Sequence, residues 1–363
     1  MYYAVIMAGG AGERFWPYSR RTLPKQLLPL IDNKTMLEHI IEAIGEAFAP
    51  ERIFVAANKL VSESIRKRLS MIPPENILSE PVSKNTAPCL ALAMGVISRL
   101  DPEAVVGVFT ADHLIRKVQN FRKNLKTALK CAQERSTIVT LGIPPTRPET
   151  GFGYVEFGEE CYRTDSGCAH SVKRFREKPS LEQARDFLAQ GNFYWNSGMF
   201  FWTVRTFEKE CEQHCPELAE TIREIRRAWG TPEQERVVCR CFEHLPRLSI
   251  DYALMERTRN VAMVAAEFQW DDVGAWEALA RIGRPDQNGN VAVGDVLLLD
   301  CSNTIVFGHA DAGSVKPVIA GLGLKDLIIV QTTDAILVCP RSEAQRVKEL
   351  VEALREKGKT HIL

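Results

Sequence analysis

Residues 3–14 carry the sequence YAVIMAGGAGER, in which an apolar run ends directly on a group of glycines. The run Tyr3–Ala8 is rich in β-forming residues and predicts a buried strand. Glycines placed directly after a strand let backbone N–H groups approach an anion, because no Cβ stands in the way. The stretch therefore predicts a phosphate-binding loop, although a tight turn would show the same pattern.

Predicted strands and helices alternate in the first third of the chain. Two further β-rich runs, Arg52–Ala57 and Ala104–Ala111, predict strands. Apolar residues at helical spacing predict helices over Met36–Phe48, Ala87–Leu100 and, more weakly, Phe121–Gln133. This alternation is typical of an α/β fold in which helices cover a parallel sheet. Ligands of such sheets lie beyond the carboxyl ends of the strands, so the glycine loop and Asp112 should face one crevice.

The pattern becomes mixed after about residue 137. Strand-like runs cover 137–143, 153–157 and 172–175, and helical patterns cover 181–190 and 207–227. The turn-rich segment Asp286-Gln287-Asn288-Gly289-Asn290 then precedes short β runs and a charged final helix from about Ser342 to Lys357. We therefore predict two domains, residues 1–285 and 286–363, as expected for a chain of 363 residues.

Charge and composition exclude several classes of protein. The 46 Lys and Arg residues balance the 46 Asp and Glu residues, so the chain lacks the positive field that non-specific binding of nucleic acid or anionic membranes requires. We find no signal peptide and no apolar run of membrane-spanning length, and we expect a cytoplasmic location. Because the charges balance, any phosphate site must be formed by a local group of cations and not by a positive field of the whole chain.

The ten cysteines show no CxxC pair. Reduced thiols are the expected state. A zinc site could be imagined from Cys211, His214, Cys215, Cys239 and Cys241, but CxxxC and CxC spacings fit zinc sites poorly. We interpret these side chains as packing residues.

Two cations lie shortly after the glycine loop. Arg14 and Lys25 flank a segment stiffened by Pro17 and Pro24, which suits them to hold phosphates, although solvated surface charge is the plain alternative. The loop lacks the Gly-Lys-Ser/Thr ending of a P-loop and the third glycine of a dinucleotide fingerprint. A dehydrogenase is excluded further by residues 56–58, where Ala-Ala-Asn replaces the required acidic residue.

The segment AGGAGERFWPYSRRTLPKQLLPL, residues 8–30, resembles the N-terminal motif of the sugar nucleotidyltransferases. Phe15-Trp16-Pro17 and Pro24-Lys25-Gln26 are similar to the GDP-mannose pyrophosphorylase branch of that family. The resemblance implies a Rossmann-like domain with a mixed central sheet, followed by a small β domain that is a short left-handed β-helix in relatives. It also implies that the nucleotide contacts Ala8, Gly9, Gly10 and Gly12, and that Arg14 and Lys25 are catalytic.

Further motifs extend the resemblance over most of the first 280 residues. Glu80-Pro81 and Asn85-Thr86-Ala87-Pro88 resemble the segment beside the guanine base, and Thr86 is also expected to cap a helix. Glu149–Tyr154, Glu177-Lys178-Pro179 and Trp195–Gly198 resemble the sugar-binding segments. The resemblance implies that Lys178 holds the sugar phosphate and that the sugar is bound by Gly153, Glu177 and Asn196.

Two aspartates resemble the metal ligands of the family. Thr110-Ala111-Asp112-His113 resembles the strand-end motif, and Trp270–Trp276 resembles the second motif. The resemblance implies that Asp112 and Asp272 bind Mg²⁺, although a strand-end aspartate can also merely cap a helix. Asp271 stands where relatives usually have Ser. We assign no acid–base role to His113, because a phosphate monoester is already a nucleophile at neutral pH.

The resemblance implies an enzyme that makes GDP-mannose and pyrophosphate from GTP and mannose 1-phosphate. Another hexose-1-phosphate nucleotidyltransferase, such as one using glucose 1-phosphate and a different nucleotide, would share the catalytic residues. A regulatory paralogue that only binds sugar nucleotides usually loses its charged residues, whereas this chain keeps all of them. A homodimer is left open.

Overall fold

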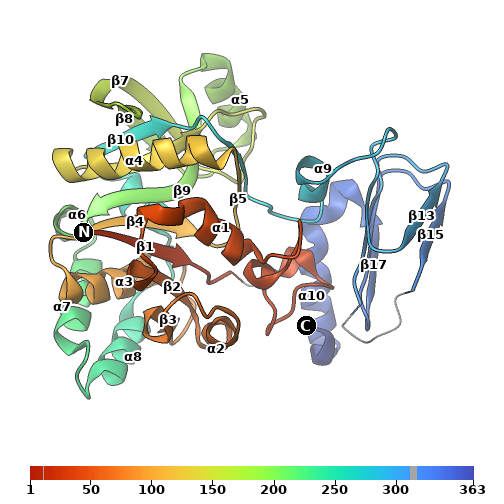
Figure 1. Ribbon diagram of the computed structural model, residues 1–363, viewed down its shortest axis with the longest axis horizontal. Coiled ribbons are helices and arrows are strands. Elements are labelled where there is room, and N and C mark those ends of the chain that lie inside the picture. The colour runs from red at the N-terminus through yellow and green to blue at the C-terminus, as the bar shows by residue number, and fades with distance from the viewer. Residues whose placement is uncertain (11, 311–316) are drawn as a thin grey trace. The chain divides into compact units, whose positions relative to one another are not determined.

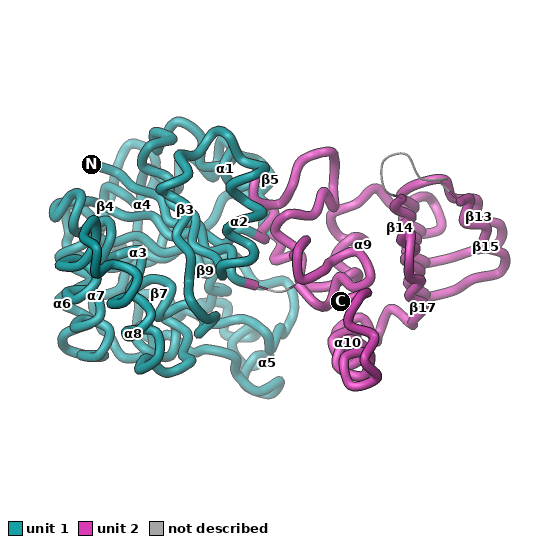
Figure 2. Tube along the Cα trace, turned by 90° about the horizontal axis from the view of Figure 1, so that it is seen from below, with its two compact units in different colours: residues 1–9, 40–111, 115–270 teal, residues 10–39, 112–114, 271–363 magenta. Residues whose placement is uncertain are grey.

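The computed structural model describes residues 1–10, 12–310 and 317–363. Two compact units are distinguished, and each is assembled from several stretches of the chain (Figure 2). Unit 1 contains residues 1–9, 40–111 and 115–270, and unit 2 contains residues 10–39, 112–114 and 271–363. Residues 10–39 and 112–114 thus group with the C-terminal part of the chain, while the domain boundary at 285/286 stays a prediction.

Within the described residues, unit 1 is built on a nine-stranded sheet. Its strands are β1 (Tyr2–Met7), β2 (Ile53–Asn58), β3 (Ile77–Glu80), β4 (Val105–Thr110), β6 (Ile138–Ile143), β7 (Tyr154–Thr164), β8 (Gly167–Arg176), β9 (Phe193–Thr203) and β10 (Val261–Ala265). They lie in the order β3-β2-β1-β4-β9-β6-β10-β8-β7. Strands β3, β2, β1 and β4 are parallel, and β9 is antiparallel to both β4 and β6. The predicted α/β fold with a mixed central sheet is confirmed.

Strands β1 and β4 end side by side. They are parallel neighbours in which Met7 lies opposite Thr110, and the Ala111 N–H donates to Met7 O at 2.9 Å. The carboxyl ends of the two strands therefore meet at one edge of the sheet, as the strand pattern predicts.

Helices cover both faces of this sheet (Figure 1). They are α1 (Met36–Ile44), α2 (Lys59–Arg68), α3 (Thr86–Leu100), α4 (Val118–Arg135), α5 (Leu181–Gln190), α6 (Val204–His214), α7 (Pro216–Ala228) and α8 (Gln234–His244). α3 packs on β1, β2 and β3, whereas α4 packs on β4, β6, β9 and β10. Strand β4 shows why both faces of the sheet must be covered, because it places apolar side chains on each of them. Val108 belongs to the core cluster on the α3 side, and the Phe109 ring meets Phe121 of α4 edge-on.

Unit 2 contains stacked short strands. They are β12 (Val291–Val293), β13 (Val296–Leu299), β14 (Ile305–Gly308), β15 (Ile319–Leu322), β16 (Leu327–Gln331) and β17 (Ile336–Pro340). β12, β14 and β16 pair in parallel, as do β13 and β15, so successive turns of the chain lie on one another. The final helix begins as a 3₁₀ turn at Arg341–Arg346 and continues as α10 (Val347–Glu356).

The residues after the glycine loop belong to the core of unit 2. Phe15 and Trp276 have ring centroids 5.1 Å apart, and Trp276 Nε1 donates to Trp16 O at 2.9 Å. Trp276 precedes the short helix α9 (Ala278–Ile282). Two short strands, β5 (Leu114–Arg116) and β11 (Gln269–Asp271), lie where the chain passes from one unit to the other. None of the described helices has both the length and the apolar composition needed to cross a bilayer.

Candidate active site

Unit 2 brings three of the predicted charged residues together. Lys25 lies in a 3₁₀ turn, and its Nζ donates to Asp112 Oδ2 at 2.9 Å and to Asp272 O at 2.7 Å. The lysine is only 5% exposed, and its ammonium also lies 5.7 Å from the centroid of the Phe15 ring. Lys25 therefore contacts both predicted metal-binding residues directly, and Asp112 is not followed by a helix that it could cap.

Gly12 is required for this position of Lys25. Its φ of +66° lies in the left-handed region, and a methyl group placed on it would lie 2.5 Å from Lys25 Cβ. By contrast, a methyl group on Gly10 would meet no atom within 4 Å. The two glycines thus differ: Gly12 is needed for packing inside unit 2, while the space beside Gly10 is open to a ligand.

The pKa values of the two aspartates are shifted in opposite directions. Although burial acts to raise the pKa of Asp112, Lys25 and then His113 lower it overall. Burial raises the pKa of Asp272, against Lys25, and the nearby carboxylates of Asp271 and Asp112 act in the same direction as burial. Lys25 and Arg281, whose Nη2 lies 3.7 Å from Asp272 Oδ1, are the cations beside these carboxylates, and a divalent ion would stabilise them further.

The described residues hold no group of three or more His, Cys, Asp or Glu side chains arranged to bind a metal on their own. Mg²⁺ does not need such a group, because it commonly takes one or two carboxylates and completes its shell with substrate phosphates and water. Asp112 and Asp272 fit that kind of site, because the one Lys25 ammonium lies within hydrogen-bonding distance of both residues, at 2.9 Å from Asp112 Oδ2 and 2.7 Å from Asp272 O.

The backbone around Asp272 is strained. Val273 has a φ of +44°, which is a true outlier for a β-branched residue, and its side chain is fully buried. Its N–H donates to Asp271 Oδ1 at 2.8 Å, while Arg281 holds both oxygens of the Asp271 carboxylate. Asp271 thus supports the turn that presents Asp272, which is a role that its position in the motif does not reveal.

Arg14 differs from Lys25 in its exposure. Its side chain is exposed, and Nη1 donates to Gly274 O at 3.3 Å. The guanidinium is therefore anchored next to Asp272 by one hydrogen bond. Its remaining N–H groups suit it to bind a phosphate from solution.

The predicted sugar-binding residues come together in unit 1. A methyl group on Gly153 would lie 2.5 Å from Glu177 Oε2, and Gly153 O accepts from the Asn196 N–H at 2.8 Å. Lys178 Nζ lies 3.2 Å from Glu177 Oε1. Lys178 has a φ of +44° directly before Pro179, where the backbone is already restricted. The structure thus brings Gly153, Glu177, Lys178 and Asn196 together in a strained, densely packed group.

Asp251 is a member of this group that the sequence does not assign. It begins the π-helical turn Asp251–Met255, and its Oδ1 accepts from Asn196 Nδ2 at 3.0 Å. Burial and then the Asp251 carboxylate raise the pKa of Glu177 to about 7, although Lys178 acts in the opposite direction. A pair of close carboxylates next to an exposed ammonium is suited to bind hydroxyl groups and a phosphate. The π-helical turn is a signal of function that only the structure reveals.

The Asn196 side chain is largely occupied by the protein. Its Oδ1 accepts from the Thr140 hydroxyl at 3.0 Å and from the Gly198 N–H at 3.2 Å, and its Nδ2 donates to Asp251. Its clearest role in the structure is therefore to orient Asp251.

The segment predicted to lie beside the guanine base begins α3. The helix cap is Asn85, whose Oδ1 accepts from the Thr86 N–H at 2.9 Å, so our expectation that Thr86 is the cap is wrong. The reason is that Thr86 Oγ1 accepts from the Ile250 N–H at 2.8 Å, which ties the helix start to another segment. Asn85 is exposed and adopts a φ of +73°.

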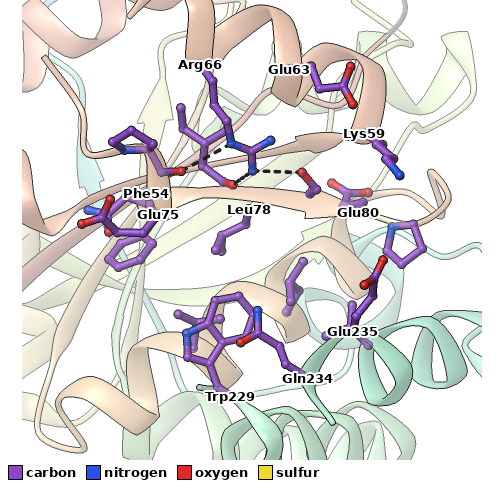
Figure 3. Close-up of a pocket in the computed structure, with 18 of the residues that line it drawn as sticks. Phe54, Lys59, Glu63, Arg66, Glu75, Leu78, Glu80, Trp229, Gln234 and Glu235 are labelled. Carbon is purple, nitrogen blue, oxygen red and sulfur yellow. Dashed lines mark hydrogen bonds between the residues drawn. The ribbon is translucent and has the colours of Figure 1, made fainter. Parts of the chain in front are cut away.

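Glu80 is a buried carboxyl group at the end of β3. Burial raises its pKa to about 7, although a hydrogen bond with Cys89 acts in the opposite direction. A methyl group on Gly9 would lie 3.7 Å from Glu80 Oε1, so this carboxyl group is next to Gly9. Glu80 also lines a cavity of about 830 Å³ along β3, where Arg66 of α2 donates to Ile77 O (Figure 3).

Comparison with known proteins identifies the family. The family model described as nucleotidyl transferase matches residues 3–288, which is more than half of the chain. The chain belongs to this family. A second model, described as MannoseP isomerase/GMP-like beta-helix domain, matches residues 294–354 and agrees with the parallel stacking of β12, β14 and β16.

Curated relatives and a solved structure show which members of the nucleotidyltransferase family the chain is similar to. It is 36% identical to the xanthan biosynthesis protein XanB of Xanthomonas campestris, over 98% of this chain and 74% of that protein. It is 38% identical to the mannose-1-phosphate guanylyltransferase of Salmonella montevideo, with the same coverage. The crystal structure of a mannose-1-phosphate geranyltransferase from Thermus thermophilus matches with a TM-score of 0.85 and 33% identity, covering 98% of this chain and 99% of that one. The predicted family and the predicted class of enzyme are confirmed.

Proposed function

We propose that this nucleotidyltransferase transfers the GMP group of GTP to mannose 1-phosphate, giving GDP-mannose and pyrophosphate. An oxygen of the hexose phosphate attacks the α-phosphorus of GTP, and the bond from that phosphorus to the β-phosphate bridging oxygen breaks. The substrate names of the relatives support the choice of GTP and mannose 1-phosphate. The observation that carries the proposal is the contact of Lys25 with both Asp112 and Asp272.

Electrostatic repulsion is the main obstacle to this reaction, because an anionic nucleophile must approach an anionic triphosphate. Mg²⁺, held by Asp112 and Asp272, would supply charge neutralisation at the phosphates. Lys25 would hold the triphosphate beside the same carboxylates, and the exposed Arg14 would bind the leaving pyrophosphate. Binding of phosphates would draw the Lys25 ammonium away from Asp112 and leave that carboxylate to the metal.

We assign the hexose to the carboxylate pair of unit 1. Glu177 and Asp251 would accept hydrogen bonds from the sugar hydroxyls, and Lys178 would hold the sugar phosphate. The exposure of the Lys178 side chain, 54%, leaves its ammonium accessible to an incoming anion. Gly153 supports this assignment by giving the Glu177 carboxylate room against the backbone.

The reaction requires no general base. The second pKa of a phosphate monoester is about 6, so the nucleophile is already ionised at neutral pH. Burial lowers the pKa of His113 to about 4, which leaves the imidazole neutral at pH 7. His113 can therefore act as a hydrogen-bonding group but not as a cation for phosphate.

The proposal is tested by incubating the purified chain with GTP, mannose 1-phosphate and MgCl₂ and separating the nucleotides by chromatography. We expect GDP-mannose and pyrophosphate in equal amounts, and no product after Mg²⁺ is removed with EDTA. Hydrolysis of GTP without a sugar nucleotide, or no reaction at all, would reject the assignment.

A further inference from the structure

Two cysteines meet at the junction of α6 and α7, which lie side by side (Figure 1). Cys211 is fully buried in the last turn of α6, and Cys215 stands between the two helices. The Cys215 N–H donates to Cys211 O at 2.8 Å, and each thiol shifts the pKa of the other. Cys215 therefore has a second cysteine four residues away, at the other side of the same helix junction.

The surroundings of Cys215 favour a thiolate. It is the N-terminal cap of α7, where the helix dipole is positive, and Arg257 lies nearby. The Cys211 thiol lowers the pKa of Cys215, burial opposes the change, and Arg257, whose Nη1 donates to His214 O at 3.0 Å, lowers it further. Cys211 shows the reverse, because the neighbouring Cys215 thiol and burial raise its pKa. The pair thus consists of one nucleophilic sulfur and one protonated partner.

A cavity gives small molecules access to Cys215. Cys215 lines a pocket of about 440 Å³ together with His214, Glu217, Arg257 and apolar side chains of α3 and α7. The pocket is large enough for a hydroperoxide and carries two potential cations against one carboxylate.

We propose that Cys215 and Cys211 form a peroxide-reactive dithiol that is independent of the nucleotidyl transfer site. The Cys215 thiolate attacks the terminal oxygen of a hydroperoxide, the O–O bond breaks, and the alcohol or water leaves with a proton, giving a sulfenic acid. The Cys211 sulfur then attacks the Cys215 sulfur, and the hydroxyl group leaves as water with the Cys211 proton. In sum, two thiols and one hydroperoxide give one disulfide, one alcohol or water molecule, and one water molecule.

The backbone permits this disulfide at the helix junction. Four residues of α-helix rise about 6 Å along the axis, which is within the range of Cα separations that disulfides span. Cβ atoms four residues apart in a regular helix are too distant, so one residue must move. Cys215 can do so because its φ of −149° and ψ of 69° already lie outside the helical region.

Mass spectrometry of one peptide tests the proposal. Trypsin cuts after Lys209 and Arg223, so peptide 210–223 contains both cysteines. After the chain is treated with a stoichiometric amount of hydrogen peroxide, we expect this peptide to be lighter by two hydrogen atoms and to resist alkylation by iodoacetamide. Dithiothreitol should restore its original mass and its alkylation. Recovery of the peptide with both cysteines still alkylatable would overturn the proposal.

Alkylation kinetics at pH 7 provide an independent test in the native chain. We expect iodoacetamide to modify Cys215 at least ~10-fold faster than Cys161, although Cys161 is exposed and Cys215 is only half-exposed. Arg257→Gln should slow the Cys215 reaction and shift its pH profile upward, whereas Arg257→Lys, which keeps the charge, should not. Equal rates at Cys161 and Cys215, or equal effects of the two Arg257 variants, would contradict the mechanism.

Discussion

Replacement of Lys178 by alanine should weaken the binding of one substrate while leaving the stability of the fold nearly unchanged. Its Nζ lies 3.2 Å from Glu177 Oε1, but 54% of the side chain is exposed, so loss of this ion pair should cost folding less than about 1 kcal/mol. A hydrogen bond to a charged phosphate contributes about 1.5–3 kcal/mol. We therefore expect the KM for mannose 1-phosphate to rise roughly 10- to 150-fold, with a lower kcat.

Steady-state kinetics with pyrophosphate release as the readout check this prediction. The KM for GTP should change less than ~3-fold, and Lys178→Arg should restore binding only in part, because a planar guanidinium replaces a compact ammonium. Lys173→Ala is the matched control and should behave as the wild type, because Lys173 is exposed on strand β8, which ends two residues before Lys178. A variant that loses affinity for GTP and keeps its affinity for mannose 1-phosphate would place Lys178 in the nucleotide site and refute our assignment.

The two groups of residues and the start of α3 allow four further predictions. Asp112→Asn and Asp272→Asn should each lower turnover at least ~10²-fold and raise the Mg²⁺ concentration needed for half-maximal rate, while Asp165→Asn, in an exposed turn, should do neither. Gly12→Ala should lower the melting temperature, since its methyl group meets Lys25 Cβ, whereas Gly10→Ala should keep the fold and weaken GTP binding. The pKa of Glu177 is raised from 4.5 to about 7, so the folded state holds this proton more tightly and the wild-type free energy of unfolding should fall as pH rises across that window. Denaturant titrations should show that Glu177→Gln, relative to the wild type, gains up to about 3 kcal/mol in free energy of unfolding by pH 7 and nothing below pH 4.5. Thr86→Ala should reduce the preference for GTP over ATP at least ~10-fold, because the Ile250 N–H loses its partner, while Thr86→Ser should retain it.

The parts of the fold that follow from local patterns could be predicted. The strands that became β1, β2 and β4 were visible as apolar runs, and α5 could be bounded because Ser180 forms a capping box with Gln183 and Gly191 ends the helix. The helix α8 and the short strand β3 were missed; β3 has only four residues, which is too short for a clear pattern.

Tertiary contacts explain the rest of what the sequence did not reveal. Asp251 meets Asn196 across 55 positions of sequence, and no local pattern records that contact. Lys25 was predicted to hold phosphates, yet its two hydrogen bonds go to Asp112 and to the backbone of Asp272, which only the folded chain brings to it. The cap of α3 is Asn85 because the Thr86 hydroxyl is taken by a residue 164 positions away.

Substrate preference tests the central claim most directly. GTP, ATP, UTP and dTTP should each be assayed with mannose 1-phosphate and with glucose 1-phosphate under identical conditions, with kcat/KM for pyrophosphate release as the measured quantity. We predict the highest value for GTP with mannose 1-phosphate, and a drop of at least ~10-fold when either substrate is exchanged. A higher kcat/KM for glucose 1-phosphate with any other nucleotide would contradict the proposed function while leaving the family unchanged.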